Sequence, residues 1–203
     1  MADERPTRER IVDEAMRLFG EHGYSATSVA DIETATGLVG GGGGLYRHFR
    51  SKRALLEAGV RRQIASNGEL LTRVRSSLAP AGRLVDRLRA LGHAGIDRLE
   101  RERDLNRLIV RDLRHFPDLL ALAAEDELHP VHAALAEWIA AQDGASDLDA
   151  PAVAAVLAGA TAHYWLLRDV FGAHPSGVPV DRYVDALAGL MAAALADPSA
   201  AGT

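Results

Sequence analysis

Two long alanine-rich segments, Ala152–Ala162 and Ala186–Ala196, constrain the fold of this chain more than any other feature. Alanine and leucine are strong helix formers, whereas strands are built from β-branched and aromatic residues, and aromatic residues make up only 5% of this chain. No repeat of about 20–50 residues is visible, which argues against a solenoid. We therefore predict an all-α protein with about nine helices.

The N-terminal region is predicted to begin with one longer and one shorter helix. Apolar residues at helical spacing predict the first helix over about Thr7–His22, and Gly23 ends it. The second helix begins at Ser28, whose hydroxyl can cap it while Asp31, three residues on, favours the same helix end. Gly37 ends this second helix.

A run of five glycines, Gly40–Gly44, follows the second helix. We expect a third short helix over about Gly41–His48, with Leu45 and Phe49 pointing inward because residues four apart share one helix face. Ser51 then caps a long fourth helix that extends to about residue 77.

The remainder of the chain is predicted to be helical, with prolines and a polar loop marking the breaks. A fifth helix starts at Pro80 and a sixth ends before Pro117, while Gly92 and Gly95 are expected to weaken the fifth. A seventh helix covers about residues 117–142, with Pro130 as the site of any bend, and the last two helices cover residues 151–171 and 180–196.

Cysteine is absent, which excludes disulfides, zinc fingers, thiolate metal sites and cysteine nucleophiles. The first ten residues lack the apolar core of a signal peptide, and we expect no run of about 18 apolar residues without a charge or a helix-breaking turn. We therefore expect a cytoplasmic protein without a membrane partner, and we predict no cofactor and no metal site.

An enzyme is one alternative, because histidines and carboxylates gather at Glu125–His132. Two histidines three residues apart across a proline have poor geometry for a metal ion, and neither H-E-x-x-H nor E-x-x-H occurs. The nucleophile motif G-x-S-x-G is also absent. We predict that the chain is not an enzyme.

Positive charge gathers locally although the net charge of the chain is −5. Residues 1–53 contain eight Lys/Arg and eight Asp/Glu, whereas residues 54–203 contain 15 and 20. Every charge after Glu33 and up to Arg53 is positive. A local basic face decides whether phosphates can be bound, so the total charge does not exclude a nucleic-acid partner.

Two short helices joined by a tight turn and followed by basic and aromatic residues have the composition of a helix-turn-helix DNA reader. The candidate helices cover residues 28–36 and 41–48. In such a motif the second helix enters the DNA major groove, which is about 12 Å wide. The alternative left open is a helical protein-interaction or adaptor protein without DNA binding.

Several short matches within this region belong to one known pattern. They are Thr7–Val12, Leu18-Phe19, Gly23-Tyr24, Thr27–Val29, Asp31-Ile32, Gly37-Leu38 and Leu45–Lys52. Together they resemble the N-terminal signature of the tetracycline-repressor (TetR) family, over roughly residues 7–56. The resemblance implies a DNA-binding domain at 1–53, a linking helix at about 51–77, and a ligand-sensing and dimerisation domain at 54–203.

The resemblance also implies a set of DNA contacts, which are Ser28, Gly41, Gly42, Gly43, Tyr46, Arg47, His48 and Lys52. Tyr46 and His48 correspond to an aromatic pair that contacts phosphates, and Lys52 to a phosphate-binding lysine. Ser28 would place its hydroxyl and neighbouring amides on a phosphate. Arg47 would face the DNA backbone or a base edge, and Arg5 and Arg8 could reach DNA as an N-terminal arm.

Three features depart from the family pattern. Seven residues separate Gly37 from Leu45, where the family usually has five. Glycines replace the family's frequent Ser-Lys-Gly-Thr. Glu33 stands where the family usually has a small alanine against the neighbouring helix. The start of the recognition helix and its packing angle are therefore open.

The glycine run has three interpretations. Each helical glycine costs about 0.8–1 kcal/mol relative to alanine, so we expect a helix that is frayed without DNA. A phosphate-binding nucleotide loop is disfavoured because no lysine follows and no G-x-G-x-x-G follows a strand. The run could also be a flexible turn with no role. We favour glycines that let backbone amides approach DNA closely.

The C-terminal two thirds are expected to supply a homodimer interface and a ligand pocket. Wide apolar faces on the last two helices predict the interface, through Val153, Val156, Leu157, Tyr164, Leu167, Phe171, Tyr183, Leu187, Leu190, Met191 and Leu195, unless these residues face their own core. Resemblance to the family implies a pocket near His93, Asn106, Arg107, Arg111, His115, His163, Tyr164 and Trp165. The expected function is a repressor that a small molecule releases from a palindromic operator.

Overall fold

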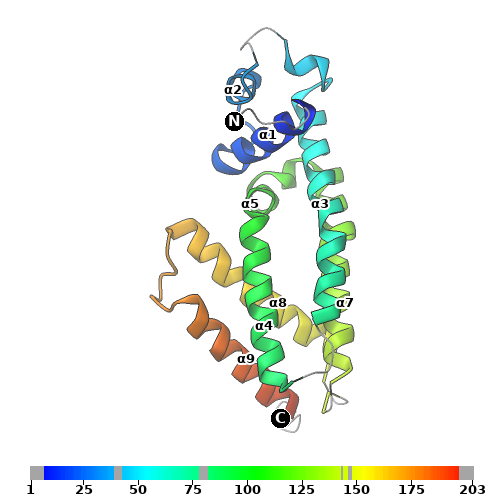
Figure 1. Cartoon of the computed structure of the whole chain (residues 1–203), viewed down its shortest axis with the longest axis vertical. Coiled ribbons are helices and arrows are strands. Elements are labelled where there is room, and N and C mark those ends of the chain that lie inside the picture. Colours follow the sequence, from blue (N-terminus) through cyan, green and yellow to red (C-terminus); the bar gives the residue numbers. More distant parts are fainter. Residues whose placement is uncertain (1–6, 39–42, 78–81, 143, 146–147, 197–203) are drawn as a thin grey trace. The chain divides into compact units, whose positions relative to one another are not determined.

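The computed structural model describes residues 7–38, 43–77, 82–142, 144–145 and 148–196, except for the side chains of residues 66–77. Helices and no strand are found within these ranges, which confirms the predicted all-α class (Figure 1). The α-helices are α1 (Thr7–His22), α2 (Val29–Ala35), α3 (Lys52–Ser77), α4 (Leu84–Arg101), α5 (Arg103–Arg111), α6 (Pro117–Ala123), α7 (His129–Ala140), α8 (Ala150–Phe171) and α9 (Val180–Ala196). Shorter elements are the 3-10 turns η1 (Leu45–Arg47) and η2 (Leu113–His115) and the π-helical turn η3 (Ala124–Leu128).

The chain divides into two compact units. The first contains residues 1–67 and 102–127, so it joins the N-terminal helices with α5 and α6. The second contains residues 68–101 and 128–203. The expected boundary at residue 53 separates a DNA-binding domain from a ligand-sensing domain by function, whereas these units are defined by packing. The functional boundary stays a prediction.

The core of the first unit is formed by the apolar positions that helical spacing predicts. Ile11, Ala15, Leu18 and Phe19 of α1 are buried, and so are Ile32 of α2 and Leu56 of α3. Leu45 and Phe49 also point inward, as their spacing of four residues predicts. Because these side chains come from α1, α2, α3 and the segment between them, one small core fixes all four.

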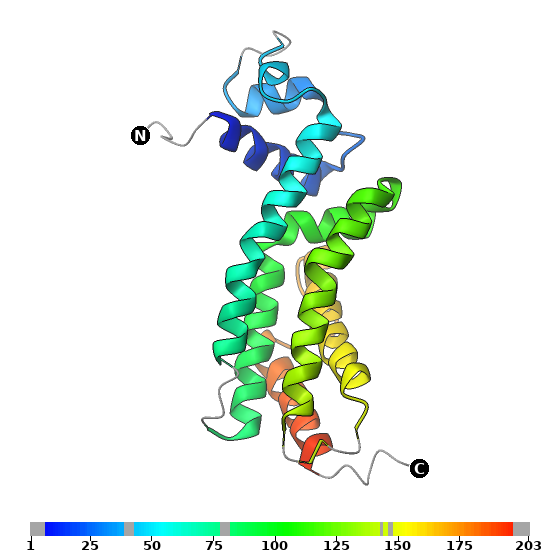
Figure 2. The ribbon, with the colours of Figure 1, turned by 90° about the vertical axis from the view of Figure 1, so that its right-hand side faces the viewer.

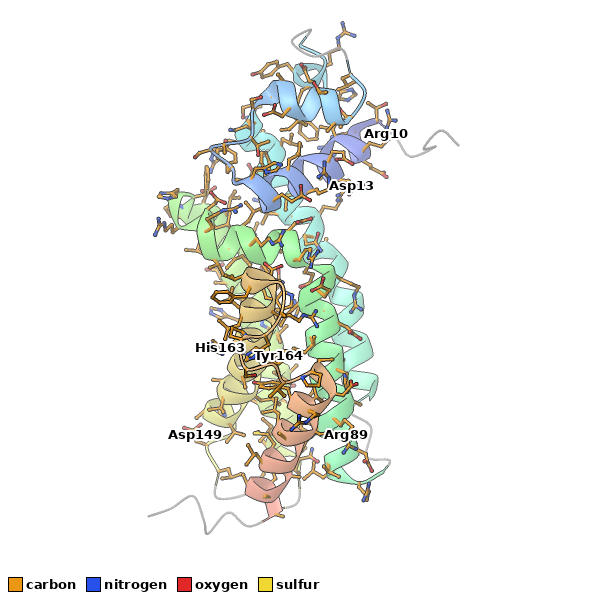
Figure 3. All side chains as sticks on the ribbon, turned by 90° about the vertical axis from the view of Figure 1, so that its left-hand side faces the viewer. Arg10, Asp13, Arg89, Asp149, His163 and Tyr164 are labelled. Atoms are coloured by element: carbon orange, nitrogen blue, oxygen red, sulfur yellow. The ribbon has the colours of Figure 1, made fainter. Side chains whose placement is uncertain are left out.

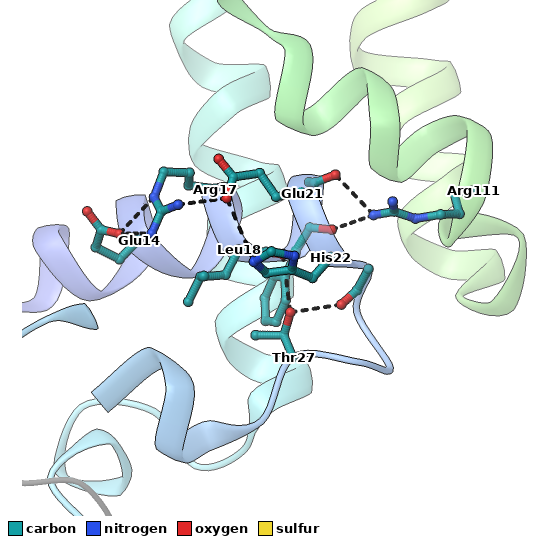
Figure 4. A network of polar contacts seen from close by, with 10 residues as sticks. Glu14, Arg17, Leu18, Glu21, His22, Thr27 and Arg111 are labelled. Atoms are coloured by element: carbon teal, nitrogen blue, oxygen red, sulfur yellow. Dashed lines mark hydrogen bonds and ion pairs between the residues drawn. The ribbon is translucent and has the colours of Figure 1, made fainter. Parts of the chain in front are cut away.

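Helix α5 is joined to the C-terminal end of α1 by Arg111. The Arg111 guanidinium donates from Nη2 to the carbonyl oxygens of Phe19 at 2.6 Å and Gly20 at 3.1 Å (Figure 4). These carbonyls belong to the last turn of α1, where the helix itself supplies few donors. Gly20 lies so close to α5 that an added Cβ would stand 2.7 Å from Asp104 Cα.

In the second unit α4 packs against both α8 and α9, and α7 packs against α8 (Figures 1 and 2). The two glycines of α4 make this packing close. A Cβ added at Gly92 would stand 2.9 Å from Val184 Cγ1, and one at Gly95 would stand 3.0 Å from Thr161 Cγ2. Gly92 and Gly95 therefore have a packing role in α4, besides the helix weakening that their lack of a side chain predicts.

The predicted seventh helix, 117–142, is irregular, but the irregularity precedes the proline. Residues 124–128 form a π-helical turn between α6 and α7. Pro130 has no N–H, so the carbonyl of Asp126 cannot receive its usual bond from four residues ahead. The chain accommodates this loss by widening the turn before Pro130.

One expectation about apolar segments is wrong. Helix α8 contains an 18-residue window that is long and apolar enough to cross a membrane by length and composition alone. Pro151 does not interrupt this helix, because a proline in the first turn lacks only an N–H that has no partner there. Only 33% of the window is buried within the structure, which leaves an apolar side of α8 exposed.

Candidate nucleic-acid interface

The N-terminus of α2 is closed by a reciprocal cap between Ser28 and Asp31. Ser28 Oγ accepts from the Asp31 amide at 3.1 Å, and the Ser28 amide donates to Asp31 Oδ2 at 2.7 Å. Hydrogen bonds from Ser28 lower the pKa of the Asp31 carboxyl, so this acid stays ionised at neutral pH. Ser28 and Asp31 are exposed, and the Ser28 hydroxyl expected on a phosphate also serves as this cap.

The turn between α1 and α2 is fixed from inside by Thr27 and Lys52. The buried Thr27 hydroxyl lies 2.8 Å from the Gly23 carbonyl oxygen and 3.2 Å from that of Leu18 (Figure 4). Lys52 Nζ donates to the carbonyl oxygens of Tyr24 and Thr27, each at 2.8 Å, and lies 4.2 Å from the centre of the Tyr24 ring. Burial lowers the pKa of the Lys52 ammonium. The sequence did not indicate this fastening role, and phosphate binding by Lys52 stays a prediction.

The segment after the glycines is shorter than the predicted helix over residues 41–48. The structure has the single 3-10 turn η1 (Leu45–Arg47), while Gly41 and Gly42 lie outside the described residues. Gly43 has a φ of +69°, in the left-handed region that a right-handed helix does not enter. A regular helix therefore cannot include Gly43 in this conformation.

Three side chains project outward beside this turn. Tyr46 is 57% exposed, and Arg47 and His48 are also exposed. The turn that carries them is anchored by Leu45 and Phe49, which are buried on the opposite side. The structure thus presents Tyr46, Arg47 and His48 on a short, anchored segment, and their contact with DNA stays a prediction.

Two basic side chains near this surface already have partners. The Arg8 guanidinium lies over the Phe49 ring, 4.6 Å from its centre, which places this predicted arm residue against the unit. Arg53 Nη2 donates to Asp118 Oδ2 at 2.5 Å, an ion pair that lowers the pKa of the Asp118 carboxyl. Arg5 lies outside the described residues.

Sequence reasoning missed the role of Glu33. This residue of α2 is only 1% exposed, and its Oε1 accepts a hydrogen bond from the Leu45 amide at 2.9 Å. The Glu33 carbonyl also accepts from the Leu38 amide at 2.9 Å. The only signal in the sequence was a charged residue at a position where the resemblance leads one to expect a small one.

The predicted ligand residues fall into both compact units. In the second unit, Tyr164 and Trp165 of α8 are buried while His163 is exposed (Figure 3). His93 of α4 lies with Nε2 3.8 Å from Asp181 Oδ1. In the first unit, Asn106 and Arg107 are half-buried, His115 is exposed, and Arg111 caps α1. Pocket formation by these residues stays a prediction.

An aromatic cluster that the sequence did not indicate surrounds Tyr164. The Tyr164 ring stacks on Tyr183 and on His174, with ring centres 4.2 and 4.6 Å apart. Its hydroxyl donates to the Val178 carbonyl at 2.8 Å. This cluster joins α8, α9 and the turn between them. Trp165, next in the sequence, donates from Nε1 to Glu100 Oε2 of α4 at 3.2 Å.

The predicted dimer residues of α8 and α9 are buried, half-buried or exposed, and the half-buried ones are Val153, Leu167, Tyr183 and Leu187. Leu157, Tyr164, Met191 and Leu195 are buried within their own unit, so for these the expectation of an exposed face is wrong. The large apolar residues that stay exposed on these helices are Val156 (63%), Val170 (63%), Phe171 (65%) and Leu190 (72%). Helical spacing identifies an apolar residue but does not say which neighbour covers it.

Known proteins resemble this chain in sequence and in fold. A sequence model described as "Bacterial regulatory proteins, tetR family" matches residues 11–58. YvkB of Bacillus subtilis, an uncharacterised HTH-type transcriptional regulator, is 28% identical over 116 residues, 57% of each chain. The transcriptional repressor AcnR of Corynebacterium glutamicum is 36% identical over 73 residues, 35% of this chain and 38% of its own length. This chain therefore spans less than two thirds of either relative.

The fold extends the similarity beyond the N-terminal region. AibR, solved in complex with isovaleryl coenzyme A and operator DNA, superimposes with a TM-score of 0.67 over 91% of this chain and 97% of AibR, at 22% identity. That likeness concerns the fold alone. Together with the sequence match over residues 11–58, it shows that the chain is similar in sequence and in fold to transcriptional regulators of the TetR family.

Proposed function

We propose that this chain is a homodimeric, ligand-responsive repressor that binds palindromic operator DNA through α2 and the turn η1. The observation that carries the proposal is the exposure of Tyr46, Arg47 and His48 on a turn whose other side is buried by Leu45 and Phe49. Anchored side chains can meet a duplex in one orientation, which sequence preference requires. A gene regulator of this kind would act in the cytoplasm, which we propose as its location.

Tyr46 and His48 are proposed to contact phosphates, and the proposal for Arg47 has two testable forms. A phosphate contact by Arg47 would add about 0.9 to the slope of log affinity against log salt concentration. A base contact would instead fix the preference at one operator position, so that Arg47→Ala relaxes it. Arg17→Ala is the matched control, because Arg17 is a basic residue of α1 paired with Glu14 and Glu21 (Figure 4).

Dimerisation is proposed to occur through the exposed apolar sides of α8 and α9. Exposed large apolar residues gather on these two helices, and α8 has the composition of a helix covered on several sides. Patches of this kind mark protein contacts in soluble proteins. A second copy of the chain would cover the patch and would place two DNA-binding units on successive half-sites.

The effector is proposed to be a small organic molecule, and acyl-CoA thioesters are the first class to screen, because AibR shares this fold and was solved with isovaleryl coenzyme A. An effector that binds better to a non-binding arrangement of the dimer would release DNA by its difference in affinity. Residues 54–203 are proposed to form this sensing and dimerisation domain.

The test has two steps. Genomic fragments bound by the purified protein are selected and sequenced, and an inverted repeat is expected among them. Bound fragments are then challenged with a panel of acyl-CoA thioesters, and at least one is expected to release them. His48→Ala should weaken operator binding, whereas His22→Ala, which removes an exposed histidine of α1, should not. A protein that shows no sequence preference at low ionic strength would instead support a helical adaptor.

A further inference from the structure

We infer that Glu33 is a positioning residue for DNA recognition: its buried carboxylate, supplied by α2, caps the turn η1 that follows the glycine run. This inference rests on the proposed DNA-binding function and adds a residue that makes no DNA contact itself. The Glu33 side chain connects α2 with η1, the two elements on either side of the glycine segment.

The cap is visible in the contacts of Glu33. Its Oε1 lies 2.9 Å from the amide nitrogen of Leu45, the first residue of η1. The preceding residue, Gly44, makes no side-chain cap, because it has no side chain. The first amides of a helical turn have no partner within it, so the acceptor for Leu45 has to come from elsewhere. Glu33 supplies it from 12 residues earlier in the chain.

Loss of this hydrogen bond should cost more than loss of a cap on the surface, because both partners are buried. Glu33 is 1% exposed and Leu45 is 0% exposed, so water cannot replace either partner. A buried donor left without a partner is costly. A Cβ added at Gly44 would be 3.7 Å from Glu33 Oε1 and 3.5 Å from Leu38 Cβ, so Gly44 lies within van der Waals reach of both residues.

The bond to Glu33 is therefore one of the contacts that hold η1 against α2, beside the burial of Leu45 and Phe49 in the shared core. The glycines carry no side chains that could pack and fix the turn from its N-terminal side. Leu45 is both the anchor of the turn and the donor to Glu33, and Tyr46 follows it directly. Removing the acceptor should let the start of the turn shift, so that Tyr46, Arg47 and His48 lose their common orientation.

The experiment compares Glu33→Ala, Glu33→Gln and the control Glu14→Gln in the full chain. Glu33→Gln keeps an Oε1 acceptor without the charge, and it provides the test if Glu33→Ala does not fold. Glu14→Gln removes one negative charge from a half-buried site of α1, where Glu14 pairs with Arg17, and leaves η1 untouched. The readouts are hydrogen exchange at the Leu45 amide and affinity for the selected operator and for a scrambled duplex of equal length.

For Glu33→Ala we expect Leu45 exchange to accelerate about tenfold or more and operator affinity to fall about tenfold, while affinity for the scrambled duplex changes less than about twofold. Glu33→Gln should recover part of both losses. Glu14→Gln should change both affinities by the same factor. The inference would be overturned if Glu33→Ala kept both the wild-type operator preference and the wild-type exchange rate of the Leu45 amide. If only Glu33→Gln folds, the same two results in that variant would overturn it. Failure of the proposed function is distinguishable, because the unaltered protein would then prefer no duplex.

Discussion

Two neighbouring glycines before η1 should respond to alanine in opposite ways. Gly44 has φ −58° and ψ −40°, a conformation that alanine adopts readily, and an added Cβ would make ordinary contacts of 3.5 Å with Leu38. Gly43 has nothing within 4 Å of an added Cβ, but its φ of +69° is strained for any residue with a side chain. The effect of Gly43→Ala on stability is therefore set by the backbone conformation and not by a steric clash.

The magnitudes follow from these conformations. Gly44→Ala should stabilise the fold by about 0.4–1 kcal/mol, because alanine restricts the unfolded chain. Gly43→Ala should destabilise it by about 1–2 kcal/mol, the usual cost of a left-handed conformation with a Cβ. The two variants should differ by about 1.5–3 kcal/mol, or very roughly 3–12 °C in Tm for a chain of this size.

The assay is thermal unfolding followed by circular dichroism, with operator binding measured on the same samples. An added methyl at Gly44 would point toward Leu38 and Glu33, so Gly44→Ala should leave operator affinity within about twofold of wild type. Gly43→Ala should weaken operator binding because it moves the start of η1. Equal Tm shifts of the same sign in the two variants would refute the assigned backbone conformations.

Three further predictions concern the packing, the pH dependence and the assembly. Gly20→Ala should lower the free energy of unfolding by about 2 kcal/mol or more in denaturant titrations, because an added Cβ would meet the backbone of Asp104. Gly59→Ala should cost less, because its added Cβ would meet the flexible Met16 side chain. Equal losses in the two variants would contradict this distinction. Burial raises the pKa of the Asp104 carboxyl, so its relative contribution to stability is full below the ordinary aspartate pKa and is lost as pH rises through the raised value. Asp104→Asn should therefore unfold at higher denaturant concentration than wild type at pH 7, with a difference that disappears toward pH 3, and a difference that grows on acidification would contradict the assignment. Leu190→Glu should convert the proposed dimer to monomer in sedimentation experiments while leaving helicity unchanged, because Leu190 is 72% exposed in the single chain. A dimer that persists in this variant would place the interface elsewhere.

Much of the first unit could be predicted from the sequence, because its elements follow local rules. The stripe of α1 from Ile11 to Phe19, the cap at Ser28 and the inward pair Leu45 and Phe49 depend on spacings of three or four residues. Such spacings are set by helix geometry and can be read without knowing any neighbour. The bounds of α1 were predicted correctly for the same reason.

The parts that could not be predicted depend on contacts between distant residues. Tyr164 has the spacing of an interface residue, but it is covered by Tyr183 and His174 of its own unit. Lys52 has the position of a phosphate ligand, and only the structure shows its bonds to the turn at Tyr24. Glu33 stood out in the sequence as a charged residue at an unexpected position. Its partner, the Leu45 amide, lies beyond the glycine run, and local sequence rules do not specify the path of that run.

The contact between α1 and α5 limits how the N-terminal helices could be transferred to another protein. Arg111 closes the last turn of α1, and Gly20 permits α5 to approach it, so α1 is fitted to a helix that lies far outside the family match at residues 11–58. A chimaera that transplants only those residues onto another sensor would carry an α1 whose C-terminal carbonyls lack their guanidinium. A chimaera built from this chain should therefore keep α5 together with α1 and place the junction after α5.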